Sequence, residues 1–61
     1  MRTVSDWLAD NQFHEFIAIT KKQGIDNLDI LRTLTEAEME QHLGMTKIGD
    51  RRKMTLALRK L

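Results

Sequence analysis

Apolar residues recur at helical spacing along this chain, and the pattern predicts five helices. The clearest stripe lies in the last stretch, at positions i, i+3, i+4 and i+7: Met54, Ala57, Leu58 and Leu61. Gly44 is expected to end the preceding helix, and Thr46 to cap this last and longest one. Ile48 lies away from the stripe, so we expect its aliphatic side chain to be exposed.

The first half of the chain predicts two short helices. Thr3 can cap the first, with Asp6 in its first turn, and Asn11 is a plausible stop. Its buried face comprises Val4, Trp7 and Leu8. The second helix is expected to place four residues on one face and to end before Gly24, a residue suited to a left-handed C-terminal position. Those four residues are Phe13, Phe16, Ile17 and Thr20.

Two more helices are predicted in the middle of the chain. Asp26 or Asn27 can cap a brief third helix that carries three leucines, Leu28, Leu31 and Leu34. The run from Thr35 to Glu38 is a capping box that opens a fourth helix, with Met39 and Leu43 facing inward. Met45 is expected to hold the following turn against the core.

These elements predict an all-α fold: one domain over residues 1–61, a compact five-helix bundle with a long C-terminal helix. The chain contains no proline and three glycines, which agrees with a helical class. A chain of 61 residues buries only about 60% of its unfolded surface, so its core is small. The predicted core is Trp7, Leu8, Phe13, Phe16, Ile17, Ile25, Leu31, Leu34, Met39, Leu43, Met54, Leu58 and Leu61.

Charge is unevenly distributed along the chain, although the net charge is only +1. Residues 24–42 carry five carboxylates against Arg32, a net charge of −4. Residues 43–61 carry six cations against Asp50, a net charge of +5. Asymmetry of this kind bears on association rather than on fold.

Few features of the chain point to chemistry. There is no cysteine, which excludes disulfides and cysteine-ligated zinc, and which fits an intracellular, cytoplasmic location. His14 and His42 lie far apart without metal-ligand spacing, and Ser5 has no defensible triad partners. No apolar run approaches the roughly 20 residues that span a membrane. We therefore expect no enzyme activity, no metal, no cofactor and no small-molecule substrate.

Five motifs, taken in order, resemble the sterile alpha motif (SAM) domain over essentially the whole chain. They are Val-x-x-Trp-Leu from Val4, Phe-x-x-Phe from Phe13, Gly-Ile-Asp from Gly24, Leu-Thr-Glu-x-Glu-Met from Leu34, and Leu-Gly-Met-Thr-Lys-Ile-Gly-Asp-Arg-Arg-Lys-Met from Leu43. The resemblance implies a protein–protein interaction module. Many SAM domains join head to tail, an acidic mid-loop surface of one copy meeting the end-helix surface of the next.

The resemblance places two candidate interfaces on this chain. The end-helix interface would comprise Thr46, Lys47, Ile48, Gly49, Arg51 and Arg52. The mid-loop interface would comprise Asp26, Asn27, Leu28, Asp29, Glu36 and Glu38. The expected partner is the domain itself or another SAM domain. Because the two interfaces differ, such a contact is heterologous and can propagate.

The alternative partner is an RNA hairpin, which a minority of SAM domains bind. Here the contacts would come from four cations at the start of the last helix: Lys47, Arg51, Arg52 and Lys53. Asp50 departs from that pattern, because it places a carboxylate where RNA-binding members tend to have a small or basic residue. The acidic middle segment further favours a protein partner, since RNA binding has no use for it.

Overall fold

Local capping begins and ends the first helix where the sequence predicts. The computed structural model describes residues 3–61. Helix α1 (Val4–Asp10) begins after Thr3, whose hydroxyl accepts a hydrogen bond of 3.1 Å from the Asp6 amide, and it ends at Asn11. Such a cap stabilises a helix by about 1 kcal/mol, so this short element depends on it.

The second predicted helix is divided into two pieces. A 3-10 helix, η1 (His14–Phe16), precedes helix α2 (Ile17–Lys22). Gln12 has a φ of 65°, a left-handed conformation, and this turn leaves Phe13 outside the helix that was expected to begin there. The C-terminal end is as predicted, with Gly24 at a φ of 74° directly after the last turn.

The middle helices follow their predicted caps. The Asn27 side chain accepts the Ile30 amide at 2.9 Å and opens helix α3 (Leu28–Arg32). Helix α4 (Glu36–Leu43) opens with the predicted capping box and ends at Gly44 in a left-handed conformation. Leu34 falls in the α3–α4 connection rather than on α3, because that helix ends two residues earlier.

The longest helix, α5 (Ile48–Arg59), begins one residue later than a Thr46 cap would place it. Lys47 occupies the N-cap position without a side-chain hydrogen bond, so the prediction for Thr46 is wrong. Thr46 instead belongs to the preceding turn, where its amide donates to the Gly44 carbonyl at 2.9 Å. The first-turn amides of α5 reach the Lys47 carbonyl.

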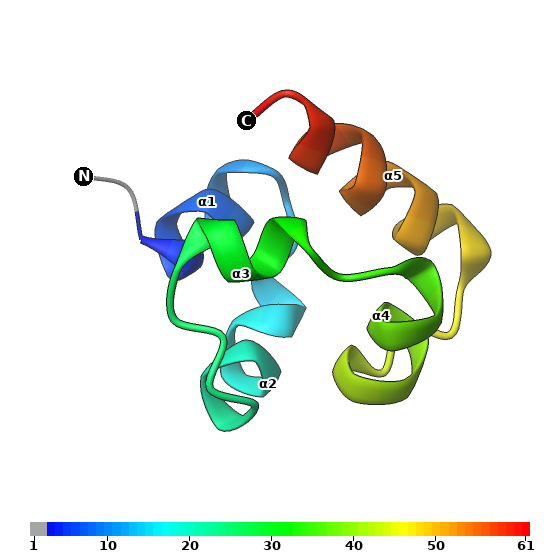
Figure 1. Ribbon diagram of the computed structural model, residues 1–61, viewed down its shortest axis with the longest axis horizontal. Helices are drawn as coiled ribbons and strands as arrows, with labels where there is room; N and C mark the ends of the chain where they lie inside the picture. The colour runs from blue at the N-terminus through cyan, green and yellow to red at the C-terminus, as the bar shows by residue number, and fades with distance from the viewer. Residues whose placement is uncertain (1–2) are drawn as a thin grey trace.

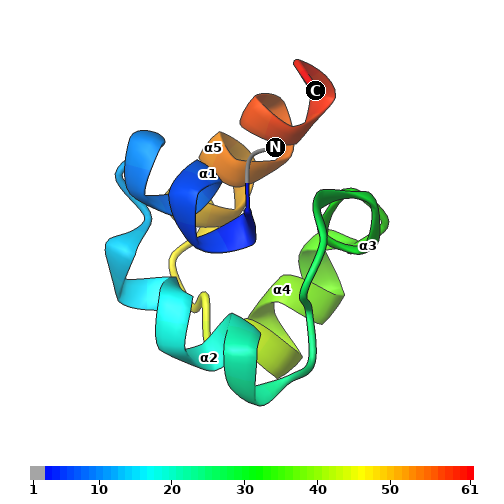
Figure 2. The ribbon, with the colours of Figure 1, turned by 90° about the vertical axis from the view of Figure 1, so that its left-hand side faces the viewer.

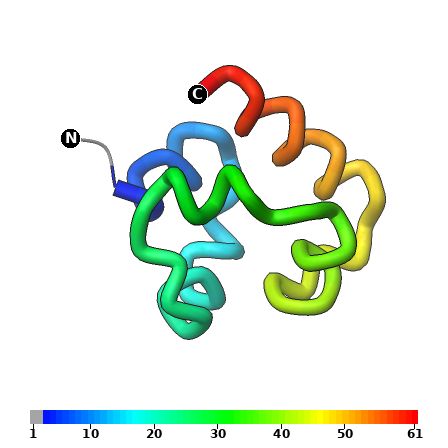
Figure 3. The backbone as a smooth tube through the Cα atoms, viewed as in Figure 1, coloured from blue at the N-terminus to red at the C-terminus, as the bar shows by residue number. Residues whose placement is uncertain are grey.

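Five α-helices and the short η1 are packed as two neighbouring groups over residues 3–61. Helix α1, η1 and α2 contact one another on the left of Figure 1, while α4 packs against α5 on the right. Helix α3 contacts α5 and so belongs with the second group. A quarter turn shows α3 and α4 to one side and α1 to the other (Figure 2), and the trace in Figure 3 follows the same path.

One hydrophobic cluster occupies the space between these helices. Its buried members are Val4, Trp7, Leu8, Phe13, Phe16, Ile25, Leu31, Met39, Leu43, Met45, Met54 and Leu58. The Trp7 and Phe13 rings stack with centroids 6.3 Å apart, and Phe16 lies 6.2 Å from Phe13. Stacking of this kind adds roughly 0.5–1.5 kcal/mol to the burial of each pair.

Most of the predicted core is confirmed, with one error. Ile17 and Leu34 are only partly buried and pack against the cluster. Leu61, which was predicted to extend the α5 stripe, is 41% exposed. Helix α5 ends at Arg59, so the helical spacing that placed Leu61 on the stripe no longer applies at that position.

Candidate protein-interaction surface

The first turn of α5 presents an aliphatic side chain to solvent. Ile48 is 56% exposed, and its neighbours Lys47 and Gly49 are also exposed. No heavy atom lies within 4 Å of the position that a Cβ on Gly49 would take, so the backbone is open to close approach here. We call Lys47, Ile48, Gly49 and Arg52 the end-helix surface.

Arg51 belongs to the interior of the α4–α5 junction rather than to this surface. Its side chain is only 15% exposed. One guanidinium nitrogen donates to the Met45 carbonyl at 2.8 Å, to the Thr46 carbonyl at 3.1 Å and to Glu40 at 3.3 Å. Arg51 therefore holds the turn before α5 and joins that turn to α4.

Arg52 points outward, with a side chain that is 66% exposed. Its Nε lies 3.4 Å from a carboxylate oxygen of Glu36, and the other oxygen of that carboxylate lies 3.9 Å from Nε of Arg51. Glu36 was predicted to belong to the mid-loop interface, but the structure brings it beside the two arginines of the end-helix interface. The cause is the packing of α4 against α5.

The start of α3 gathers four of the predicted mid-loop residues: Asp26, Asn27, Leu28 and Asp29. Asn27 is committed to capping, and Asp29 lies 3.7 Å from Arg32. Leu28 is half-buried and Asp26 is exposed. We call Asp26, Leu28, Asp29 and Ile30 the mid-loop surface; Ile30 was missed by the sequence analysis, and it is 41% exposed.

Glu38, the sixth predicted mid-loop residue, lies on α4 and serves its own helix. Its side chain accepts the Thr35 amide at 2.9 Å, while its amide donates to the Thr35 hydroxyl at 3.1 Å. Hydrogen bonding of the Glu38 carboxyl to the backbone and then to the side chain of Thr35 lowers the pKa of that carboxyl, because it favours the charged form.

Charge separation along the sequence is only partly retained in space. Glu36 and Glu40, two of the five carboxylates in residues 24–42, lie against Arg51. The opposite charges in these pairs partly neutralise each other. The start of α5 is therefore less basic, and residues 24–42 are less acidic, than the charges in the sequence indicate. Ile48 and Ile30 give each surface an exposed apolar residue that does not depend on this charge.

Neither a cluster of metal-ligating side chains nor a membrane-spanning helix is found in the part of the chain that the structure describes. Across residues 3–61, no three histidine or carboxylate side chains are grouped to hold a metal ion. None of the helices in this range has the length and hydropathy that a bilayer crossing requires.

A family model for the SAM domain (sterile alpha motif) matches residues 1–61. Comparison with curated proteins and with solved structures gives no match. The five-helix architecture and the match over the whole chain agree with each other. The chain therefore belongs to the SAM domain family, whose members are generally protein–protein interaction modules rather than enzymes.

Proposed function

We propose that this domain associates head to tail, with its own copies or with another SAM domain, by placing its end-helix surface against a mid-loop surface. The observation that carries the proposal is Ile48, an aliphatic residue 56% exposed at the open first turn of the longest helix. Lys47 and Arg52 flank it, and Gly49 leaves the backbone accessible. Thr46 borders this surface, and Arg51 supports it from beneath.

Apolar burial should contribute more to the affinity than charge does. Covering the exposed part of Ile48 is worth roughly 1–1.5 kcal/mol. Each exposed ion pair is worth about 0–1 kcal/mol and is screened by salt. The cations therefore set orientation and association rate, while Ile48 on one side and Leu28 with Ile30 on the other hold the contact.

Sedimentation velocity over a range of protein concentration tests the proposal. The Lys47→Glu, Ile48→Ser double variant should abolish association, and so should Asp26→Lys with Asp29→Lys. Lys60→Glu is the matched control, since Lys60 is an exposed cation at the other end of α5. Each interface variant keeps one intact surface, so a mixture of the two should form a discrete heterodimer and nothing larger.

If the unsubstituted (parent) chain is monomeric, the only partner that the proposal still allows is a different SAM domain. That outcome is tested by titrating a second SAM domain and comparing the parent with the Ile48→Ser chain. If the parent is monomeric at high micromolar concentration and no SAM domain binds through Ile48, the proposal is wrong.

Glu36 offers a separate test, because it competes with any partner carboxylate for Arg52. Glu36→Gln removes the charge that lies 3.4 Å from Nε of Arg52 while keeping the shape of the side chain. Releasing an exposed ion pair should tighten association by up to about fivefold at low salt. If Glu36→Gln weakens association instead, Glu36 contacts the partner directly and the surfaces are wrongly drawn.

The RNA alternative is weakened by the same contacts. Of its four cations, Arg51 is engaged with two carbonyls, and Arg52 shares the Glu36 carboxylate. Lys47 and Lys53 remain exposed. Hairpin-selective binding at physiological salt, with the steep salt dependence of phosphate contacts, would favour RNA over the protein partner.

A further inference from the structure

Beyond Ile48, one face of α5 carries a stripe of polar and apolar side chains of which the proposed function uses only Arg52. Thr55, Leu56 and Arg59 follow Arg52 at spacings of three and four residues, which places them on neighbouring positions of one helical face. Leu56 is 55% exposed. Leu56 lies between Arg52 and Arg59 on this face.

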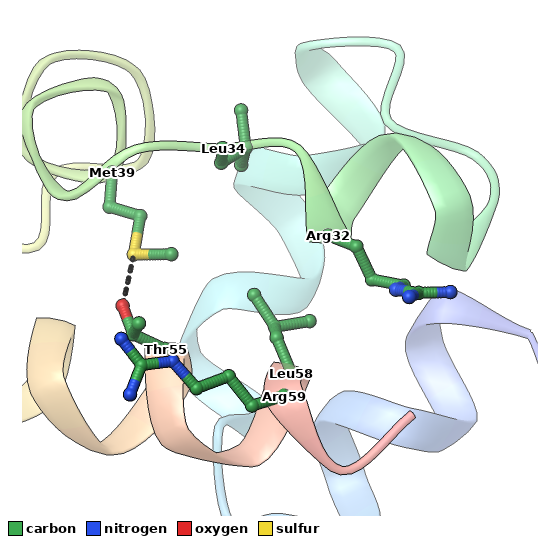
Figure 4. A pocket seen from close by; sticks show the side chains of 6 residues that line it. All are labelled: Arg32, Leu34, Met39, Thr55, Leu58 and Arg59. Carbon is green, nitrogen blue, oxygen red and sulfur yellow. Dashed lines mark hydrogen bonds between the residues drawn. The ribbon is translucent and has the colours of Figure 1, made fainter.

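A hollow of about 240 Å³ lies between this face and the α3–α4 connection. Its lining residues are Arg32, Leu34, Met39, Thr55, Leu58 and Arg59. In Figure 4 the Thr55 hydroxyl meets the Met39 sulfur at one end of the hollow, while Arg32 lies at the other. Leu34, on the α3–α4 connection, and Leu58, on α5, lie between them, so the lining in the middle of the hollow is apolar.

A second hollow, of about 380 Å³, continues along the helix and is lined by Glu36, Arg52, Thr55, Leu56 and Arg59. Thr55 and Arg59 line both hollows, so the two hollows are adjacent, and Leu56 lines the second. We call the two hollows together the α5 groove. It lies on a different stretch of α5 from Ile48.

Guanidinium groups dominate the charge of the α5 groove. Its lining contains Arg32, Arg52 and Arg59 against Glu36. Arg52 is paired with Glu36, and Arg32 with Asp29 at 3.7 Å. Within residues 3–61, the Arg59 side chain has no ion-pair or hydrogen-bond partner. The groove therefore combines an apolar centre with an unneutralised cation.

We propose that the α5 groove binds a short acidic segment of a partner protein, with an apolar side chain of that segment on Leu56 and its carboxylates on the arginines. Arg52 and Arg59 are seven residues apart, about 10 Å along the helix axis. An extended segment covers that distance in three residues, at about 3.3–3.6 Å each. Because side chains of an extended segment alternate between its two faces, only residues i, i+2 and i+4 face the groove together. The partner segment thus carries carboxylates at positions i and i+4 with an apolar residue at i+2, and the long arginine side chains accommodate the slightly larger spacing.

Anisotropy of a fluorescein-labelled peptide, Glu-Glu-Leu-Leu-Glu-Glu, tests this directly. Binding should be saturable, and Leu56→Ser and Arg59→Glu should each weaken it by about tenfold, because each removes one half of the recognition. Lys60→Glu makes the same charge change as Arg59→Glu at the next residue and should leave binding within about twofold. A peptide with serines in place of the leucines should bind at least about tenfold more weakly.

Amide chemical shifts of the unmodified chain locate the peptide without any substitution. Shifts concentrated at Leu34, Thr55, Leu56 and Arg59 support the proposal, whereas shifts concentrated at Ile48 overturn it. Equal losses from Arg59→Glu and Lys60→Glu would mean that only general charge attraction is at work, which also overturns it.

Self-association separates this proposal from the previous one. Leu56→Ser should leave sedimentation of the chain unchanged, and Ile48→Ser should leave peptide binding unchanged. If Leu56→Ser instead abolishes self-association and the peptide does not bind, the groove is a contact between copies and the partner segment assigned here is wrong.

Discussion

Arg51 and Arg52 are adjacent residues of the same chemistry with different surroundings, and they should respond differently to the same substitution. Arg51→Gln and Arg52→Gln each remove one positive charge from the start of α5. Arg51 is 15% exposed and donates to two backbone carbonyls, whereas Arg52 is 66% exposed and has one carboxylate beside it. Only the first substitution should lower the stability of the domain appreciably.

The size of the effect follows from these contacts. A hydrogen bond from a charged donor contributes about 1.5–3 kcal/mol, and a buried carbonyl that loses its partner is costly. The Thr46 carbonyl can turn to water, because that residue is exposed, but the bond to the Met45 carbonyl is partly buried. We expect Arg51→Gln to cost about 2 kcal/mol. Arg52→Gln should cost less than about 1 kcal/mol, as exposed pairs do.

Thermal and urea unfolding followed by Trp7 fluorescence measures both variants, since Trp7 is the only tryptophan and is 2% exposed in the folded domain. For a domain of this size, a loss of 2 kcal/mol lowers Tm by roughly 8–16 °C. Both variants lose one positive charge, so a difference between their Tm values cannot come from the change in net charge. If the two variants melt within a degree or two of each other, the assignment of Arg51 to the interior of the α4–α5 junction is refuted.

Three further predictions concern the core, a cap and the open helix start. Trp7→Ala should cost about 3–5 kcal/mol and abolish cooperative unfolding measured by circular dichroism. The low pKa of Glu38 stabilises the fold above the ordinary glutamate range, and this contribution is lost as pH falls through the lowered value. The stability difference between the parent and Glu38→Gln should therefore shrink as pH falls below about 4. Gly49→Ala should raise stability by up to about 1 kcal/mol in urea unfolding yet weaken association in sedimentation.

Helix boundaries were predictable wherever a local hydrogen bond sets them. Thr3, Asn27 and Thr35 each accept an amide three residues ahead, and that spacing is visible in the sequence alone. Gly24 and Gly44 end helices because both adopt left-handed backbone, which glycine tolerates best. The buried positions followed from the same helical spacing, and for that reason the prediction failed at Leu61, beyond the last turn of α5.

Tertiary packing decided what the sequence could not. Threonine is a residue type that often caps helices, which is why Thr46 was predicted to be a cap. In the structure, however, its amide donates to the Gly44 carbonyl and its carbonyl accepts from Arg51. In the sequence, Glu36 belongs to an acidic segment. In the structure, the packing of α4 against α5 places its carboxylate beside Arg51 and Arg52. The distances between these charged groups depend on how two helices pack, so they cannot be predicted by counting charges along the chain.

The arrangement of α1, η1 and α2 in one group and α4 with α5 in the other has a kinetic consequence. Among the helix pairs with the most extensive contacts, most are neighbours along the chain, and α3 against α5 closes a longer loop. Chains with such local topology fold within microseconds to milliseconds. Because a domain of this size is only marginally stable, fast folding is accompanied by frequent opening. Partners that bind only the folded form then lengthen its lifetime by mass action, so that assembly would protect each subunit from proteolysis.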